Sequence, residues 1–73
     1  MSADIIFTDG HGRKTPMGNV HDSVAYDMIE HYSKHPGSVV IESAMDFAIS
    51  GSAQIGMPDG SVIQFIDTSY IER

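Results

Sequence analysis

The stretch HPGSVVIESAMDFAISG, residues 35–51, decides whether the middle of this 73-residue chain is helix or strand. As a helix, its apolar residues form a stripe at i, i+3, i+4, i+7 and i+8, with Ser38 as the N-terminal cap and Gly51 as the stop. As a strand, apolar and acidic side chains alternate, and only Ser43 breaks the alternation. The two alanines favour the helix, whereas the Val-Val-Ile run favours the strand. We expect a helix over 38–50 and keep the strand as the alternative.

The segment that follows predicts a β-hairpin. SAQIGM and SVIQFI flank MPDGS, where Pro58-Asp59 suits a type I turn and Gly60 suits the left-handed position after it. We therefore expect strands at about 52–57 and 61–67. The tail from Asp67 onward is mostly polar and is expected to fray or to continue the second strand.

The N-terminal segment predicts one strand and a short return. Residues 4–8, DIIFT, are β-branched and aromatic, and D-G-H-G closes the run as a turn. Arg13–Thr15 can return as a second strand, which Pro16 and Gly18 are expected to end.

A helix over about 19–34 is indicated by the next pattern. Asn19 suits the N-terminal cap, and apolar residues from Val20 to Tyr32 recur at helical spacing. Acids come early in this segment, and Lys34 and His35 come late, as the helix dipole prefers.

This order of elements predicts an α+β fold in a single small domain, residues 1–73. The N-terminal strand and the C-terminal hairpin would form a small antiparallel sheet, packed against the helix at 19–34 and the expected helix at 38–50. A winged helix-turn-helix has the same order of elements, so that arrangement stays open.

Composition excludes several classes of protein. The chain has no Cys, so disulfides and Cys-ligated zinc are excluded, and an intracellular, cytoplasmic setting is favoured. No apolar run approaches the ~20 residues that span a bilayer, so we expect no membrane partner. Ten acids against four bases give a formal charge of −6, which opposes direct binding to nucleic-acid phosphates.

Residues with catalytic or metal-binding chemistry do not form a recognisable motif. His31 and His35 have the i, i+4 spacing of a metal pair, but Tyr32 stands where a zinc protease would have its Glu. We expect His31 to be a solvated helix residue and His35 a capping cation, with no metal or cofactor. Asp9 follows a strand in IIFTDGHG, but its spacing suits a plain turn. The chain lacks a G-x-S-x-G elbow and a P-loop, so we expect no enzymatic activity.

The helix-turn-helix hypothesis conflicts with charge. A recognition helix lies between two rows of phosphates, usually with flanking Lys or Arg. Here the candidate helix would present Glu42 and Asp46 and no base. A winged-helix transcription regulator, contacting DNA directly or through a partner, is therefore the alternative rather than the main hypothesis.

A protein partner with a basic surface is the main hypothesis. Tyr is enriched at interface hot spots, and spaced carboxylates can imitate phosphates and occupy a nucleic-acid site. The candidate partner-binding residues are Asp22, Tyr26, Asp27, Glu30, Glu42 and Asp46. In size and acidity the chain resembles the small regulators that bacteriophages encode, such as anti-CRISPR, anti-restriction and RNA-polymerase-binding inhibitors. That resemblance implies an inhibitor that occludes a surface on a host complex that handles nucleic acid. The oligomeric state is left open.

Overall fold

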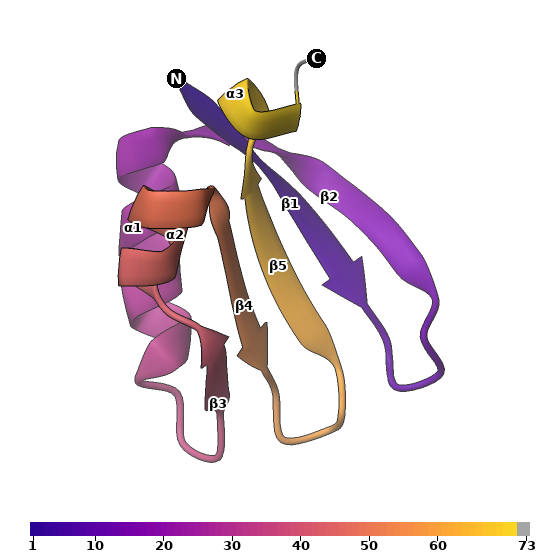
Figure 1. Ribbon diagram of the computed structural model, residues 1–73. Helices are drawn as coiled ribbons and strands as arrows, with labels where there is room; N and C mark the ends of the chain where they lie inside the picture. Colours follow the sequence, from indigo (N-terminus) through magenta and orange to yellow (C-terminus); the bar gives the residue numbers. More distant parts are fainter. Residues whose placement is uncertain (72–73) are drawn as a thin grey trace.

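A computed structural model, which describes residues 1–71, shows a five-stranded antiparallel sheet with α1 and α2 beside it (Figure 1). In chain order the elements are β1 (Ser2–Thr8), β2 (Lys14–His21), α1 (Asp22–Ser33), β3 (Val39–Glu42), α2 (Ala44–Ser50), β4 (Ser52–Gly56), β5 (Val62–Asp67) and α3 (Thr68–Ile71). Across the sheet the strands follow the order β2-β1-β5-β4-β3. The predicted α+β class is confirmed, because the N-terminal strand and the C-terminal hairpin share one sheet against the helices.

The core lies between the helices and one face of the sheet. Alternate strand residues point to this face, since side chains alternate along a strand. Phe65 on β5 stands opposite Ile5 on β1 and Ala53 on β4, and all three are buried. The helices contribute their own apolar residues to the same cluster. The buried hydrophobic residues are Ala3, Ile5, Ala25, Ile29, Phe47, Ala53, Ile55, Ile63 and Phe65.

The C-terminal hairpin confirms its prediction. β4 and β5 pair in antiparallel register from Ser52 opposite Ile66 to Gly56 opposite Val62. Gly60 adopts φ 91°, a left-handed conformation that favours glycine. The Asp59 carboxylate accepts hydrogen bonds from the Ser61 backbone N–H at 2.9 Å and from the Ser61 hydroxyl at 2.6 Å. These two hydrogen bonds hold the pKa of Asp59 below its ordinary value of 3.8, and the bond from the Ser61 hydroxyl has the larger effect.

The lowered pKa of Asp59 predicts a pH-dependent contribution to stability. A carboxylate whose pKa falls on folding stabilises the folded state above its ordinary pKa, and this contribution is lost as the pH falls through the lowered value. We therefore expect Asp59→Asn to unfold at lower urea concentration than the wild type near neutral pH, with a difference that shrinks as the pH is taken below 3.8. Urea titrations of both proteins across this range test it. A difference that is the same at every pH would contradict the role assigned to this turn.

The middle stretch contains both of the alternatives that its sequence left open. Val39–Glu42 form β3, and Ala44–Ser50 form α2. Ser43, the residue that breaks the strand alternation, caps the helix, whereas Ser38 was the expected cap. Gly51 closes α2 with φ 81°, as expected for the C-terminal stop.

The second strand is longer than predicted. β2 runs from Lys14 to His21, through Pro16 and Gly18, which were expected to end it. Both residues are tolerated because β2 is an edge strand, where Pro need not donate to a neighbour on its outer side. The register against β1 shifts between Ile5 and Ile6, and this irregularity accommodates the extra residue.

The first helix starts later than predicted. It begins at Asp22, with His21 as the cap, rather than at Asn19. The His21 ring nitrogen Nδ1 accepts from the Ser23 backbone N–H at 3.2 Å. Val20 still packs against the core, but from β2. In the sequence, Val20 fitted the apolar stripe of a helix. In the structure it is apolar because it lies on the inward face of β2.

The tail turns into the short helix α3 instead of fraying or extending β5. Asp67 is buried, and its carboxylate accepts from the backbone N–H of Ser69 at 3.0 Å. The Thr68 hydroxyl donates to the Ser2 carbonyl at 3.1 Å, so α3 is fastened to the start of β1.

Candidate interaction surface

The charges of the molecule are unevenly distributed. Residues 22–50, which make α1, β3 and α2, hold five acids and one base, Lys34. Arg13 and Lys14 lie at the β1–β2 turn, at the edge of the sheet farthest from β3 and α2 (Figure 1). Four of these acids lie on the helices, namely Asp22, Asp27, Glu30 and Asp46. The helical layer is therefore acidic, and a basic partner would be attracted to it in preference to the hairpin.

The outer face of α1 carries three of the candidate partner-binding residues. Tyr26 is 37% exposed, and its ring packs edge-on against Phe47 of α2, with centroids 5.2 Å apart at 82°. Asp27, the next residue, and Glu30, one turn further along the helix, are both exposed. Glu30 lies 3.4 Å from the Lys34 ammonium, but both side chains are largely solvated, so this pair holds the carboxylate only weakly. The helix thus presents an ordered aromatic ring beside two accessible carboxylates.

Glu42 lies apart from the α1 residues. Its side chain is on the sheet face turned away from the helices, where Oε1 accepts from the Ser52 hydroxyl and from Gln54 Nε2, both at 2.8 Å. Gln64 Nε2 donates to the same Ser52 hydroxyl at 3.3 Å. This polar network spans β3, β4 and β5, so Glu42 helps to hold the edge strand in place.

Asp46 and Asp22 lie in the first turns of α2 and α1. Asp46 completes a capping box with Ser43: its Oδ2 accepts from the Ser43 backbone N–H at 2.8 Å, while its own backbone N–H donates to the Ser43 hydroxyl. It nevertheless remains exposed. Asp22 is half-buried at the first position of α1, and its Oδ1 is buried with no hydrogen-bond partner among the described residues. Asp22 therefore offers less to a partner than Asp27 or Glu30.

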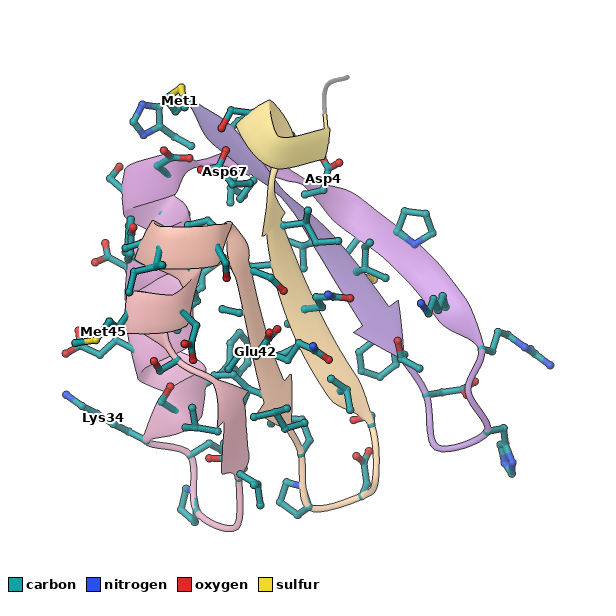
Figure 2. All side chains as sticks on the ribbon, viewed as in Figure 1. Met1, Asp4, Lys34, Glu42, Met45 and Asp67 are labelled. Carbon is teal, nitrogen blue, oxygen red and sulfur yellow. The ribbon has the colours of Figure 1, made fainter. Side chains whose placement is uncertain are left out.

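An exposed apolar strip adjoins these acids, and the sequence reasoning missed it. Val39, Val40 and Ile41 on β3 and Met45 and Ile49 on α2 are all exposed, the last two at 71%. The sequence analysis grouped the apolar residues of this stretch on one face and did not identify that face as exposed. We call these five residues the 39–49 strip. Figure 2 shows Met45 pointing outward on the same side of the molecule as Lys34.

The histidine pair does not share a helix face. α1 ends at Ser33, so His35 lies in the loop after it, where its Nδ1 is 3.0 Å from the Pro36 carbonyl oxygen. His31 packs its ring edge-on against Tyr32. Over residues 1–71, no group of three or more His, Asp or Glu side chains is placed to hold a metal ion.

The Asp9 turn has a structural role. The Asp9 carboxylate accepts from the backbone N–H groups of His11 and Arg13, at 2.9 and 3.0 Å. These bonds close the β1–β2 turn, as the spacing indicated.

The helix-turn-helix arrangement is not formed. β3 stands between α1 and α2, so the two helices are not joined by a simple turn. α2 has seven residues and its only charged side chain is Asp46. Among the described helices, none is long and apolar enough to cross a membrane.

Two hollows open on the surface. One, of about 580 Å³, lies on the outer face of β1 and β2 beside Ile6, Lys14 and Pro16. The other, of about 420 Å³, lies between Tyr32 at the end of α1 and the β4–β5 turn. Both are wide open and mostly apolar. The second is lined by Ser61, whose hydroxyl donates to the Asp59 carboxylate within the β4–β5 turn, and by His35, whose Nδ1 lies 3.0 Å from the Pro36 carbonyl oxygen.

Comparison with known proteins does not extend this description. No family model matches the chain, and neither curated proteins nor solved structures gave a significant match. The surface itself is therefore the basis for the functional argument.

Proposed function

We propose that the protein is a small binding module, not an enzyme, that attaches stoichiometrically to a basic protein surface through the outer face of α1. The observation that carries this proposal is the separation of charge: five acids and one base over residues 22–50, with Arg13 and Lys14 on the far hairpin. Tyr26 supplies an ordered aromatic contact within this acidic region.

The finer proposal is that the partner handles nucleic acid. Asp27 and Glu30 are accessible carboxylates on consecutive turns, which a cluster of Lys and Arg could bind in place of phosphates. Occupying such a cluster would occlude it from DNA or RNA. This is the mode of action of the phage-encoded inhibitors that the chain resembles in size and acidity, and it requires no cofactor.

The test is capture of a partner from nuclease-treated lysate by the wild-type protein and by the double variant Asp27→Asn/Glu30→Gln. Each exposed ion pair contributes about 0.2–1 kcal/mol, so we expect the variant to bind about 2- to 30-fold more weakly. The matched control is His11→Lys/Met17→Lys, which changes the net charge equally at exposed positions of the β1–β2 hairpin. The control should bind like the wild type.

Salt gives a second readout of the same contact. Raising ionic strength from 0.1 M to 1 M shortens the screening length from ~10 Å to ~3 Å, so binding should weaken steeply. Affinity that is unchanged by salt, or equal in the double variant, would contradict the proposal. Recovery of DNA without a protein when the nuclease is omitted, together with a shift of labelled DNA at low salt, would favour the alternative, a DNA-contacting regulator.

A further inference from the structure

The two edges of the sheet differ in how well they are protected. The β2 edge contains Pro16, which has no N–H, Gly18 at φ 138°, the charged Lys14 and a register shift against β1. Proline, charge and bulges are devices that prevent another strand from pairing with an edge. The β3 edge, Val39–Glu42, has neither proline nor lysine. β3 has a register shift of its own against β4, between Val40 and Glu42, so its edge differs from that of β2 in having no proline and no lysine.

The β3 edge is also apolar. Val39, Val40 and Ile41 are 62%, 44% and 53% exposed, although residues of this type gain from burial. β3 pairs with β4 on one side, so alternate N–H and C=O groups on its other side have no strand to bind. The strand therefore combines hydrogen-bonding capacity with exposed apolar area.

The register shift between Val40 and Glu42 puts Ile41 on the same face of β3 as Val39 and Glu42. A Cβ on Gly56 would lie 3.6 Å from Ile41 Cδ1 and 3.9 Å from Val39 Cβ, so both side chains flank the same point of β4. Glu42 lies on the sheet face turned away from the helices, where it binds Gln54. Val39 and Ile41 thus share a face, and Val40 lies between them in the chain.

We infer that β3 pairs with β3 of a second copy of this chain, so that two molecules form one continuous antiparallel sheet about a two-fold axis. The axis passes beside Val40, which faces Val40 of the other copy. Val39 then faces Ile41, whereas Glu42 lies beyond the register shift and outside this regular pairing. Two-fold pairing requires that opposite residues share a face, and the Val39–Ile41 pair meets this condition. No two acids stand opposite each other.

Charge at the two ends of β3 supports a second copy as the occupant. Lys34 and His35 precede β3, whereas Glu42 ends it and Asp46 follows in α2. Antiparallel pairing brings the basic end of one strand beside the acidic end of the other, at both ends of the contact. A basic segment from another protein would complement Glu42 and Asp46 but would place like charge beside Lys34.

Dimerisation is independent of the proposed function. The contact uses β3 and the adjoining part of α2, while the proposed partner binds the outer face of α1. Because the two-fold axis is perpendicular to the sheet, both α1 helices lie on the same side of the dimer. The dimer would therefore present two acidic surfaces in one direction.

Disulfide trapping tests the pairing directly, because the chain has no native cysteine. Val40→Cys places two thiols across the axis, where opposite Cβ atoms are about 4.5–5.5 Å apart. The matched control is Val24→Cys on α1, since Val24 and Val40 are the same residue type and are both 44% exposed. We expect Val40→Cys to form the covalent dimer at least about tenfold faster than Val24→Cys. Equal rates would overturn the inference.

Mass in solution gives a second measurement that needs no cysteine. We expect sedimentation equilibrium of the wild type to give twice the chain mass of 7.9 kDa. Val40→Lys would place like charges opposite each other, so it should raise the dimer dissociation constant at least about tenfold. The circular dichroism spectrum should not change, because Val40 is outside the buried core. A monomeric wild type at about 0.1 mM, well above a micromolar dissociation constant, would overturn the inference. So would a Val40→Lys dimer as tight as the wild type.

Discussion

Replacement of Phe65 by alanine is expected to lower the free energy of unfolding by about 3–5 kcal/mol, the usual loss for a buried Phe. Phe65 is fully buried at the centre of the sheet, opposite Ile5 on one side and Ala53 on the other. Stability of about 0.05–0.15 kcal/mol per residue gives a chain of 73 residues roughly 4–11 kcal/mol in total. The variant should therefore lose a large share of its stability and unfold at a markedly lower temperature and urea concentration than the wild type, which unfolding followed by circular dichroism would show.

Phe7→Ala is the matched control for this prediction. Phe7 is on the neighbouring strand β1 but is only partly buried. It loses less apolar contact on truncation, so its loss should be well under that of Phe65→Ala. If both variants lost the same free energy of unfolding, burial at the centre of the sheet would not determine the loss, and the prediction would be wrong.

Phe47→Ala is expected to lower the free energy of unfolding by about 3 kcal/mol. Its first effect should be to destabilise α2. Phe47 is the buried residue of α2, and it joins that helix to Tyr26 of α1 and to the core. Without the ring, the seven-residue helix has only its caps and partly buried contacts such as Ala44 to hold it, and so short a helix is not stable alone. Amide exchange in α2 should therefore accelerate more than exchange in β5.

Met45→Ala provides the comparison, since Met45 is in the same helix and 71% exposed. Its effect on unfolding should stay within about 0.5 kcal/mol. If Phe47→Ala accelerated amide exchange equally in α2 and β5, α2 would unfold together with the sheet. That result would contradict the prediction that α2 is held mainly by Phe47.

The elements that the sequence predicted correctly are those whose signals agree. In the C-terminal hairpin, alternation and turn chemistry indicate the same structure, with Pro58-Asp59 and Gly60 at the turn. At residues 38–50 the signals conflicted because two elements share the stretch. Ser43 followed by Asp46 is a capping-box pattern, and it was the readable sign that a helix starts after the strand.

The errors have tertiary causes. β2 was predicted too short because Pro16 and Gly18 disfavour a strand in isolation, and only the position of β2 at the sheet edge makes them acceptable. The exposure of Val39–Ile41 could not be predicted either, because an apolar strand reads the same whether a neighbour covers its edge or not. Two of the candidate contact acids have partners within the fold: Glu42 accepts from Ser52, and Asp46 accepts from Ser43. Only the Asp46 contact is local in sequence, so only that one could be read from the spacing.

The adjacency of β1 and β5 has a consequence for how the chain folds during synthesis. β5, the last strand to be made, lies between β1 and β4, so the sheet is split until Val62–Asp67 have left the ribosome. Until then, β1 and β4 each expose an edge that β5 later covers. Contacts between the two ends of a chain form slowly, because a large loop must close first. The nascent protein therefore acquires its core in one late step, and during that interval it is most exposed to chaperones, proteases and aggregation.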